Sequence, residues 1–293
     1  MSKPTVLLTG ATGFLGSHLL EALLKQGYPV VILIRSTSNL WRIEHLVGQY
    51  KSYNVDSQSI AQAFEEQRID FVIHTACHYG RNGSDLSELI ESNLMFGLRV
   101  LEAAIFHQAK SFINTDSFLP RDLNAYSLSK KQLVDWLKQQ STKIQVINFK
   151  LEHMYGPKDD PSKFIAWLVT QLKLNVSVIN LTSGIQKRDF IYIDDVVSAF
   201  LCVIEKAEDL LSFSEFEVGT GDSIEVKTFV QMLKSIFEQR FGQTKTQLNF
   251  GAVPYRQGEI MKFNVNNQAL RQLGWQPQVS LSQGLERSLE RSA

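Results

Sequence analysis

The sequence predicts an α/β fold, in which a doubly wound parallel sheet carries helices on both faces and a smaller C-terminal lobe follows. Three observations predict it. A glycine-rich turn, Thr9–Gly16, separates an apolar run from a helical pattern. Apolar runs then alternate with helical patterns as far as residue 151, and this alternation stops after Gly156-Pro157. Such alternation indicates parallel strands that are joined by crossover helices.

The turn at Thr9–Gly16 predicts a pyrophosphate site. It follows the apolar strand Val6-Leu7-Leu8 and precedes leucines at helical spacing, which end at Gly27. A strand–turn–helix unit of this kind presents backbone N–H groups and a helix N-terminus to an anion. Three spaced glycines alone would fit a purely structural turn equally well, so the flanking elements carry the prediction. The expected cofactor contacts are Gly10, Thr12, Gly13, Phe14, Leu15 and Gly16.

Further apolar runs predict the rest of the sheet. Strands are expected at 30–34, 50–55, 71–76, 112–115 and 144–151, and helices at about 60–64, 86–107 and 125–139. Ligands on such sheets bind beyond the carboxyl ends of the strands, where the strand order reverses. The strand ends supply the further cofactor candidates Asn54, Val55, Thr75, Ala76 and Leu151.

Beyond Gly156-Pro157 the chain changes character. A polar, turn-rich segment precedes a helix at 164–173, and short strands, helices and loops follow. We expect a dinucleotide-binding Rossmann-like domain at 1–156 together with roughly 189–207. The remaining segments, roughly 157–188 and 208–293, are expected to form a substrate-binding lobe.

Composition narrows the classes of partner. The chain of 293 residues has 30 basic and 30 acidic side chains, so its formal net charge is zero. This balance predicts neither a nucleic-acid nor a membrane partner. No apolar run reaches the length of a membrane span or a secretory signal, and the chain is expected to be cytoplasmic. Cys77, Cys202 and the six histidines show no metal-ligand spacing, so no metal is predicted.

The end of the second predicted strand indicates which dinucleotide binds. An acidic residue there would accept the ribose 2′-OH of NAD, whereas a basic residue suits the 2′-phosphate of NADP. This chain has Arg35 followed by Ser36. Arg35 could simply be a surface arginine at a strand end. The alternative, which we favour, is that Arg35 and Ser36 bind the 2′-phosphate of NADPH.

A tyrosine and a lysine in Tyr126-Ser127-Leu128-Ser129-Lys130 form the catalytic candidate. Four residues apart, they share one face of a helix. A neighbouring ammonium lowers the pKa of a phenol, which makes tyrosine a usable acid or base near neutral pH. The spacing alone also fits a solvated helix face. Upstream, Thr115 and Ser117 follow a predicted strand, and either hydroxyl could polarise a carbonyl beside Tyr126.

These motifs, in this order, resemble the extended short-chain dehydrogenase/reductase family of NAD(P)-dependent nucleotide-sugar epimerases, dehydratases and reductases. The resemblance extends over the whole chain. Besides the turn and the Tyr126/Lys130 pair, it rests on Val72-Ile73-His74-Thr75-Ala76, Glu91-Ser92-Asn93-Leu94, Met154-Tyr155-Gly156-Pro157, Arg188-Asp189-Phe190 and Leu273-Gly274-Trp275-Gln276-Pro277.

The resemblance implies roles for the catalytic residues. Tyr126 would be the general acid, Lys130 would hold the nicotinamide ribose and tune Tyr126, and Ser117 would hydrogen-bond the sugar oxygen at the reacting carbon. Thr115 remains a rival for the role of Ser117. The family's dehydratases carry Thr-Asp-Glu where this chain has Thr115-Asp116-Ser117, so dehydration is not expected.

The resemblance also implies substrate contacts. Arg188 and Arg256 match two arginines that clamp the diphosphate of a nucleotide sugar, and bidentate contacts suit such a clamp. Asn93, His153 and Glu259 are further candidates. Within the family, Cys77-His78-Tyr79-Gly80-Arg81-Asn82 and Ser183–Phe190 are similar to the 4-ketoreductases that include CDP-paratose and CDP-abequose synthases. This similarity adds Tyr79 and Arg81 as sugar contacts.

The expected activity is therefore NADPH-dependent reduction of a CDP-linked 4-keto-3,6-dideoxy sugar for O-antigen synthesis. A nucleotide-sugar epimerase with NAD is the alternative, and a non-catalytic NADP-sensing regulator is the second. The resemblance further implies a homodimer packed through the Tyr126 helix and the helix before it. Leu94, Leu98, Leu133 and Trp136 could supply its contacts, or could face the sheet.

Overall fold

The computed structural model describes residues 3–80, 83 and 85–290, and it divides into two compact units. Unit 1 comprises Met1–Leu151 and Phe200–Phe216, and unit 2 comprises Glu152–Ala199 and Glu217–Ala293. The sequence-based division returns to the first domain at 189–207. In the structure this return begins at Phe200 and continues to Phe216, because the chain there adds a strand to the sheet.

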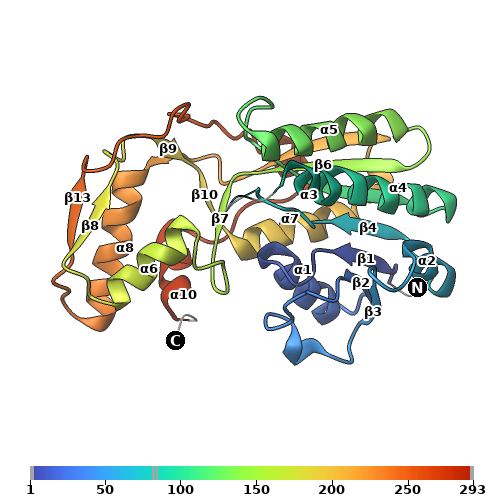
Figure 1. The fold of residues 1–293 in the computed structure, drawn as a ribbon, viewed down its shortest axis with the longest axis horizontal. Coiled ribbons are helices and arrows are strands. Elements are labelled where there is room, and N and C mark those ends of the chain that lie inside the picture. Colours follow the sequence, from blue (N-terminus) through green and yellow to red (C-terminus); the bar gives the residue numbers. More distant parts are fainter. Residues whose placement is uncertain (1–2, 81–82, 84, 291–293) are drawn as a thin grey trace. The chain divides into compact units, whose positions relative to one another are not determined.

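A seven-stranded sheet forms the centre of unit 1 (Figure 1), with the order β11-β6-β5-β4-β1-β2-β3. The strands are β1 Val6–Thr9, β2 Val30–Ile34, β3 Lys51–Asn54, β4 Phe71–His74, β5 Ser111–Ser117, β6 Gln145–Leu151 and β11 Phe213–Val218. The five pairings that join β3 through to β6 are parallel. The order reverses between β1 and β4, which confirms the predicted Rossmann-like sheet.

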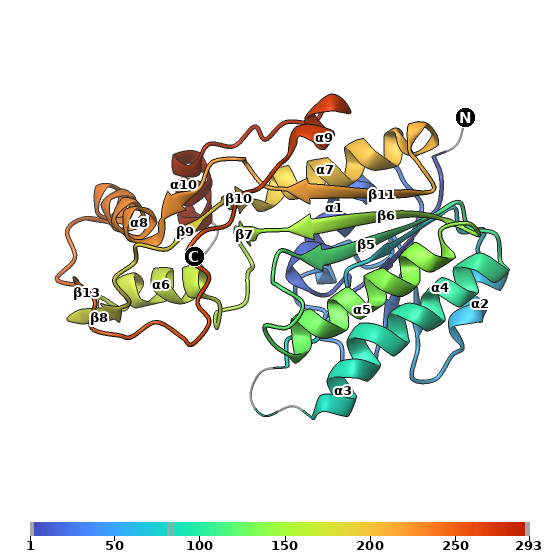
Figure 2. The ribbon, with the colours of Figure 1, turned by 90° about the horizontal axis from the view of Figure 1, so that it is seen from above.

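Helices cover both faces of the sheet (Figure 2). On one face, α2, α4 and α5 pack over Leu7, Val72, Phe112 and Val146 in a continuous apolar core. On the other, Phe200 of α7 packs against Phe149 of β6 at a ring-centroid distance of 4.3 Å. The helices are α1 Phe14–Lys25, α2 Ile60–Glu66, α3 Leu86–Ile90, α4 Phe96–Phe106, α5 Ala125–Gln140 and α7 Ile193–Glu205, with the 3₁₀ turns η1 Glu44–Leu46 and η3 Ala207–Asp209.

The helix predicted at 86–107 is not uniform. A π-helical turn, η2 (Glu91–Met95), separates α3 from α4. Such turns are frequent at functional sites, and this one carries the fully buried Asn93.

Unit 2 consists of short paired strands and helices. Its strand pairs are β7 His153–Tyr155 with β10 Phe190–Tyr192, β8 Val178–Leu181 with β13 Gln247–Phe250, and β9 Lys187–Arg188 with β12 Ile224–Glu225. Its helices are α6 Phe164–Lys173, as predicted, α8 Val226–Phe241, α9 Gln268–Gln272 and α10 Leu281–Glu290. Aromatic rings form its core, since Phe229 stacks on Phe190 at 3.9 Å and contacts Tyr155 at 6.0 Å.

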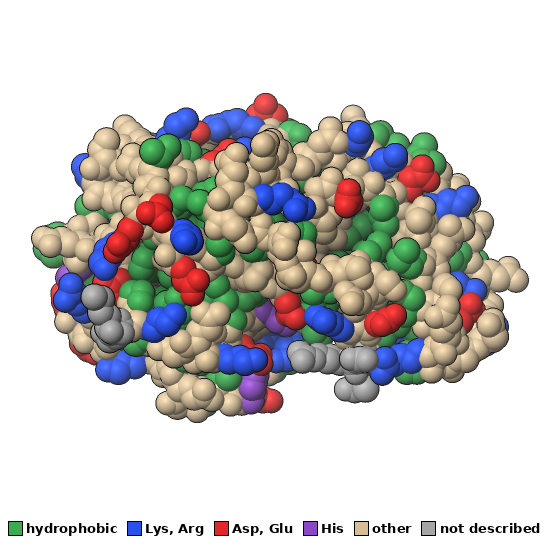
Figure 3. Space-filling view, turned by 180° about the vertical axis from the view of Figure 1, so that it is seen from behind, with side chains coloured by type: hydrophobic (Ala, Val, Ile, Leu, Met, Phe, Trp, Pro, Cys, Tyr) green, Lys and Arg blue, Asp and Glu red, His purple; other side chains and the backbone are tan. Residues whose placement is uncertain are grey.

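The charged side chains of both signs are interspersed on the face shown in Figure 3. Within the described ranges, no helix has both the length and the apolar character that crossing a bilayer requires.

Candidate active site

The glycine turn is built for close backbone approach. Gly10 has a φ of +70°, and a Cβ there would lie 2.6 Å from the backbone nitrogen of Ala76. A Cβ on Gly16 would lie 2.0 Å from the Gly10 carbonyl oxygen, so α1 can approach β1 only with glycine at this position. Gly13 is the N-cap of α1, no side chain caps that end, and the first turn has no acidic residue. The first N–H groups of the helix are thus presented to an anion.

The ends of β2 and β3 come together beside this turn. The Arg35 side chain is exposed, and its guanidinium makes no ion pair with any described residue. Asn54 donates from Nδ2 to Ser36 Oγ at 2.9 Å, and Asp56 accepts the Ser36 backbone N–H at 2.7 Å. Sequence reasoning did not identify Asp56 at this site, because its contact crosses from one strand end to another.

A second arginine, Arg42, was also not predicted. Its Nη1 donates to the carbonyl oxygen of Thr12 at 3.2 Å, so the β2–β3 connection reaches back to the glycine turn. The guanidinium also lies 4.5 Å from the centre of the Trp41 ring. Nothing in the local sequence distinguishes Arg42 from a surface arginine, since its partner lies 30 residues away.

At the end of β4, Thr75 and Ala76 are held by Thr9. Thr75 Oγ1 donates to the Thr9 carbonyl oxygen at 2.8 Å, and the Ala76 N–H donates to Thr9 Oγ1 at 3.3 Å. Thr9 Oγ1 also bonds His74 Nδ1 at 2.9 Å. Complete burial, together with the positive charge of Lys130, lowers the pKa of His74 to about 3, so this imidazole is neutral at physiological pH.

Tyr126 and Lys130 occupy successive turns of α5, as predicted. Asn124 and Ser127 form a reciprocal capping box at the start of this helix, which fixes its first residue. Lys130 is only 1% exposed, and its Nζ has no hydrogen-bond partner among the described residues. Burial lowers the pKa of Lys130, although the nearby Cys77 and Asp116 act in the opposite direction. A buried ammonium without an acceptor is costly, unless a ligand supplies oxygen atoms to it.

The two candidate hydroxyls at the end of β5 differ in their partners. Thr115 Oγ1 donates to the His74 carbonyl oxygen at 3.1 Å. Ser117 Oγ is buried and has no partner among the described residues. Ser117 thus has a donor available for another oxygen, whereas the Thr115 hydroxyl proton already has an acceptor.

Asn93 and Tyr79 connect the loop after β4 to α5. Asn93 accepts the His78 N–H at 2.6 Å and donates to the His78 carbonyl at 2.8 Å and to Ser129 Oγ at 3.0 Å. Ser129 in turn donates to the carbonyl oxygen of Tyr126. The Tyr79 and Tyr126 rings lie 5.2 Å apart. The amide of Asn93, predicted as a substrate contact, is therefore engaged mainly with protein groups. Arg81 lies outside the described residues.

Four candidate substrate residues lie in unit 2. Arg188, on β9, is 6% exposed and pairs with the carboxylate of Glu259. Its guanidinium lies 5.1 Å from the ring of Phe263, which also contacts His153 at 6.4 Å. His153 Nδ1 lies 2.9 Å from a carboxylate oxygen of Glu152. Arg256 belongs to the same turn as Glu259, because its carbonyl oxygen accepts the Glu259 N–H.

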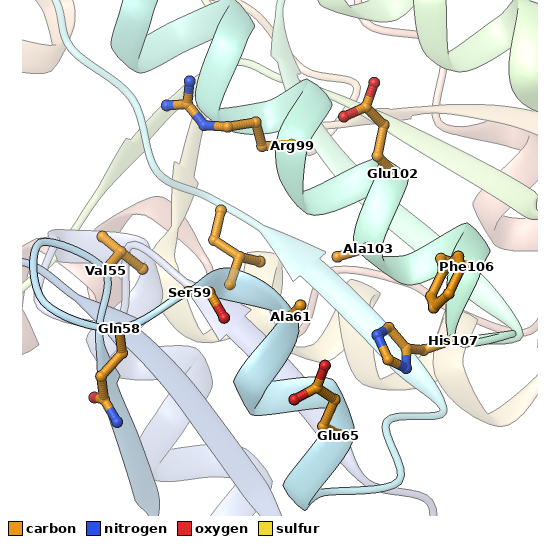
Figure 4. A pocket seen from close by; sticks show the side chains of 11 residues that line it. Val55, Gln58, Ser59, Ala61, Glu65, Arg99, Glu102, Ala103, Phe106 and His107 are labelled. Atoms are coloured by element: carbon orange, nitrogen blue, oxygen red, sulfur yellow. The ribbon is translucent and has the colours of Figure 1, made fainter.

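A hollow of about 580 Å³ lies elsewhere in unit 1, between α2 and α4 (Figure 4). Glu65, Arg99, Glu102 and His107 line it, beside an exposed Phe106. Val55 is the only predicted cofactor residue on its rim. The residues that line the hollow include no tyrosine–lysine pair like that on α5. The described residues also include no cluster of three or more metal-ligating side chains.

Residues 6–219 match the sequence pattern of the NAD dependent epimerase/dehydratase family. The chain belongs to this family. It is 34% identical over 301 residues to CDP-abequose synthase from Salmonella typhimurium, with 99% of this chain and 98% of that protein covered. CDP-abequose synthase from Salmonella muenchen is 35% identical over 293 residues, with coverage of 97% and 96%.

Solved structures show the same fold. UDP-glucose 4-epimerase from Thermotoga maritima superposes with a TM-score of 0.83 at 23% identity and covers 98% of each chain. The site of this family member fits a nicotinamide dinucleotide on two observations of its own geometry. The turn leaves no room for a Cβ on Gly10 or Gly16, and the buried Lys130 Nζ has no acceptor among the residues described.

Proposed function

We propose that this chain is an NADPH-dependent 4-ketoreductase of a CDP-linked sugar, which reduces CDP-4-keto-3,6-dideoxy-D-glucose to CDP-abequose or CDP-paratose. The observation that carries this proposal is the identity of 34–35% to two CDP-abequose synthases over nearly the whole length. The Tyr126/Lys130 pair and the neighbouring Ser117 supply the chemistry that such a reaction needs.

Three residues of unit 1 have distinct tasks in this proposal. Bound NADPH supplies the hydride that reaches C4 of the keto sugar. Tyr126 donates its phenolic proton to the C4 oxygen, which becomes the hydroxyl. Ser117 donates a hydrogen bond to the same oxygen, since its Oγ has no partner within the described part of the chain. Lys130 holds the nicotinamide ribose and keeps a positive charge beside Tyr126, which favours the phenolate that remains after proton transfer.

Arg35 supports NADPH over NADH. The guanidinium is exposed at the end of β2 and makes no ion pair in the described structure, so it can accept a phosphate without giving up another partner. Ser36 Oγ accepts from Asn54 and keeps its own proton for a phosphate oxygen. The carboxylate of Asp56 accepts the Ser36 backbone N–H, and its negative charge would repel a phosphate at this position. The positive charge of Arg35 compensates for this repulsion.

In unit 2, we propose that Arg188 and Arg256 bind the diphosphate of the substrate, and that His153 and Glu259 complete this region. Arg188 is held by Glu259 and Phe263, which fixes its orientation. A planar guanidinium with fixed orientation suits bidentate contact with phosphate oxygens. Tyr79, next to the Tyr126 ring in unit 1, is proposed as a contact of the sugar.

A homodimer through α4 and α5 is proposed as well. Of the apolar residues suggested for its interface, Leu133 is unavailable because it is completely buried in the core. Trp136 of α5 is 48% exposed, and Met95, which was not among the suggested residues and ends the turn η2 before α4, is 40% exposed, so both can contribute apolar area to a partner. Sedimentation of the purified chain tests this proposal directly.

The assay that tests the function follows NADPH oxidation by the purified chain, with CDP-4-keto-3,6-dideoxyglucose generated in situ. The dTDP-4-keto-6-deoxy sugar and NADH serve as the matched alternatives. Rapid oxidation of NADPH with the CDP substrate alone is the expected result, and NMR of the product distinguishes abequose from paratose. Absence of oxidation with either sugar, combined with tightly retained NAD, would instead identify an epimerase.

A further inference from the structure

We propose that Lys131, the neighbour of Lys130, is a positioning residue that holds the catalytic helix α5 against the end of β5. The expected effect of Lys131 on catalysis rests on the function proposed above. Adjacent residues on a helix point about 100° apart, so Lys130 and Lys131 can serve different partners from one helix. In the described structure, Lys130 Nζ has no hydrogen-bond partner, whereas Lys131 Nζ has two.

Both partners of Lys131 belong to the end of β5. Its Nζ lies 2.6 Å from Asp116 Oδ2 and 2.6 Å from the carbonyl oxygen of Ser117. The Asp116 side chain is 1% exposed and that of Lys131 is 19% exposed. Hydrogen bonds from an ammonium at these distances, shielded from water, are the strong kind. One ammonium thus joins a side chain and a backbone oxygen of consecutive strand residues to α5.

The position of this contact connects it to catalysis. Ser117 carries the hydroxyl proposed for the substrate oxygen, and α5 carries Tyr126, which protonates the same oxygen. Because Lys131 donates to the backbone carbonyl of Ser117 itself, it sets the distance between the Ser117 and Tyr126 donors. Two other side-chain contacts of α5 involve different segments, since Ser129 bonds Asn93 and Asp135 pairs with Arg121 in the loop before the helix.

The charges around Asp116 allow the positioning effect of the Lys131 contact to be distinguished from its effect on the stability of the fold. Lys150 is its register neighbour on β6, but Lys150 pairs with Glu215 of β11. Asp116 Oδ1 has no hydrogen-bond partner among the described residues, and its charge also interacts with that of Lys130 on α5. Without Lys131, Asp116 would be a buried carboxylate that lacks its direct partner, and such a charge destabilises the fold.

The experiment compares Lys131→Met, Lys131→Arg and the double variant Lys131→Met/Asp116→Asn with the parent chain. Lys138→Met, an exposed lysine on the same helix, is the control. Lys131→Met should lower kcat by roughly 10- to 100-fold through misplacement of the two donors, with NADPH binding unchanged within about twofold and a lower Tm. Lys131→Arg should recover most of kcat, because a guanidinium can donate to both oxygens.

The double variant separates positioning from stability. Neutralising Asp116 should restore the Tm of Lys131→Met, while kcat stays low because the Ser117 carbonyl still lacks its donor. Recovery of kcat together with Tm would overturn the proposal, and so would wild-type kcat in Lys131→Met. Amide hydrogen exchange of residues 117–119 requires no turnover, and it should be faster in Lys131→Met if the contact holds this strand end. It therefore tests the contact even if the parent chain oxidises no NADPH, a result that would count against the proposed function alone.

Discussion

Lys130 in unit 1 and Arg188 in unit 2 are both nearly completely buried cations, at 1% and 6% exposure, yet their surroundings differ. Among the residues that the structure describes, Lys130 Nζ has no hydrogen-bond partner, and Ser117 Oγ has none either. Arg188 pairs with Glu259, donates to the Lys187 carbonyl and lies over Phe263. Unit 1 thus has buried polar atoms whose hydrogen bonds a ligand could complete. In unit 2 the protein already provides partners for the arginine, so an anion bound there must share Arg188 with Glu259.

The strongest test of the unit 1 side of this contrast is Tyr126→Phe. Loss of the proton donor should lower kcat by about 10³-fold, within the range that general acid catalysis contributes. NADPH affinity, measured by fluorescence, should remain within about twofold because the phenol oxygen is not needed to hold the dinucleotide. Tyr50→Phe, in the loop before β3, is the control. Substantial residual turnover in Tyr126→Phe would assign the proton to another group.

In unit 2, removal of a cation should act on binding. Arg188→Met should raise the KM for the CDP sugar by roughly 30-fold with a smaller change in kcat, since a charge-assisted pair contributes about 1.5–3 kcal/mol. Glu259→Gln should have the opposite effect and lower the KM for the CDP sugar, because Arg188 then no longer shares its donors with a carboxylate. Titration calorimetry with the CDP sugar checks both. Weaker binding in Glu259→Gln would mean that the carboxylate itself contacts the substrate.

Arg35→Ser should change the cofactor preference more modestly. We expect NADPH affinity to fall by about 10-fold, with NADH affinity unchanged, because only the 2′-phosphate loses a charged partner. The dissociation constants of NADPH and NADH, measured at the same ionic strength for the variant and the parent chain, test this expectation. Equal losses for both dinucleotides would place Arg35 on the pyrophosphate instead.

The smallest effect concerns His74 of unit 1, whose buried Nε2 also has no hydrogen-bond partner in the described parts of the chain. Its folded-state pKa of about 3 lies below the ordinary value of 6.5, so at pH values between them the unfolded chain binds a proton that the folded chain does not. Stability therefore falls as pH decreases, by about 1.4 kcal/mol between pH 7.5 and 5.5. Urea unfolding of His74→Asn should lose this dependence, and His45→Asn, at an exposed site, should keep it.

The elements that the sequence predicted are those whose signals are local. Apolar runs identify β1 to β6, and a four-residue spacing identifies Tyr126 and Lys130, because strand and helix periods are visible within a few residues. The π turn at Asn93 was missed, since one extra residue in a helix leaves the hydrophobic pattern almost unchanged. Arg42 on Thr12 and Lys131 on Asp116 depend on contacts between distant segments, which no local period encodes.

Strand β11 has a consequence for how the molecule is made. It borders β6 in the sheet, although β6 ends at Leu151 and β11 begins only at Phe213. On the ribosome, β6 is therefore complete while its outer edge still waits for residues made much later, and an open edge rich in Val146, Ile147 and Phe149 invites pairing with other chains. We therefore expect nascent chains that stall between these two strands to expose this edge.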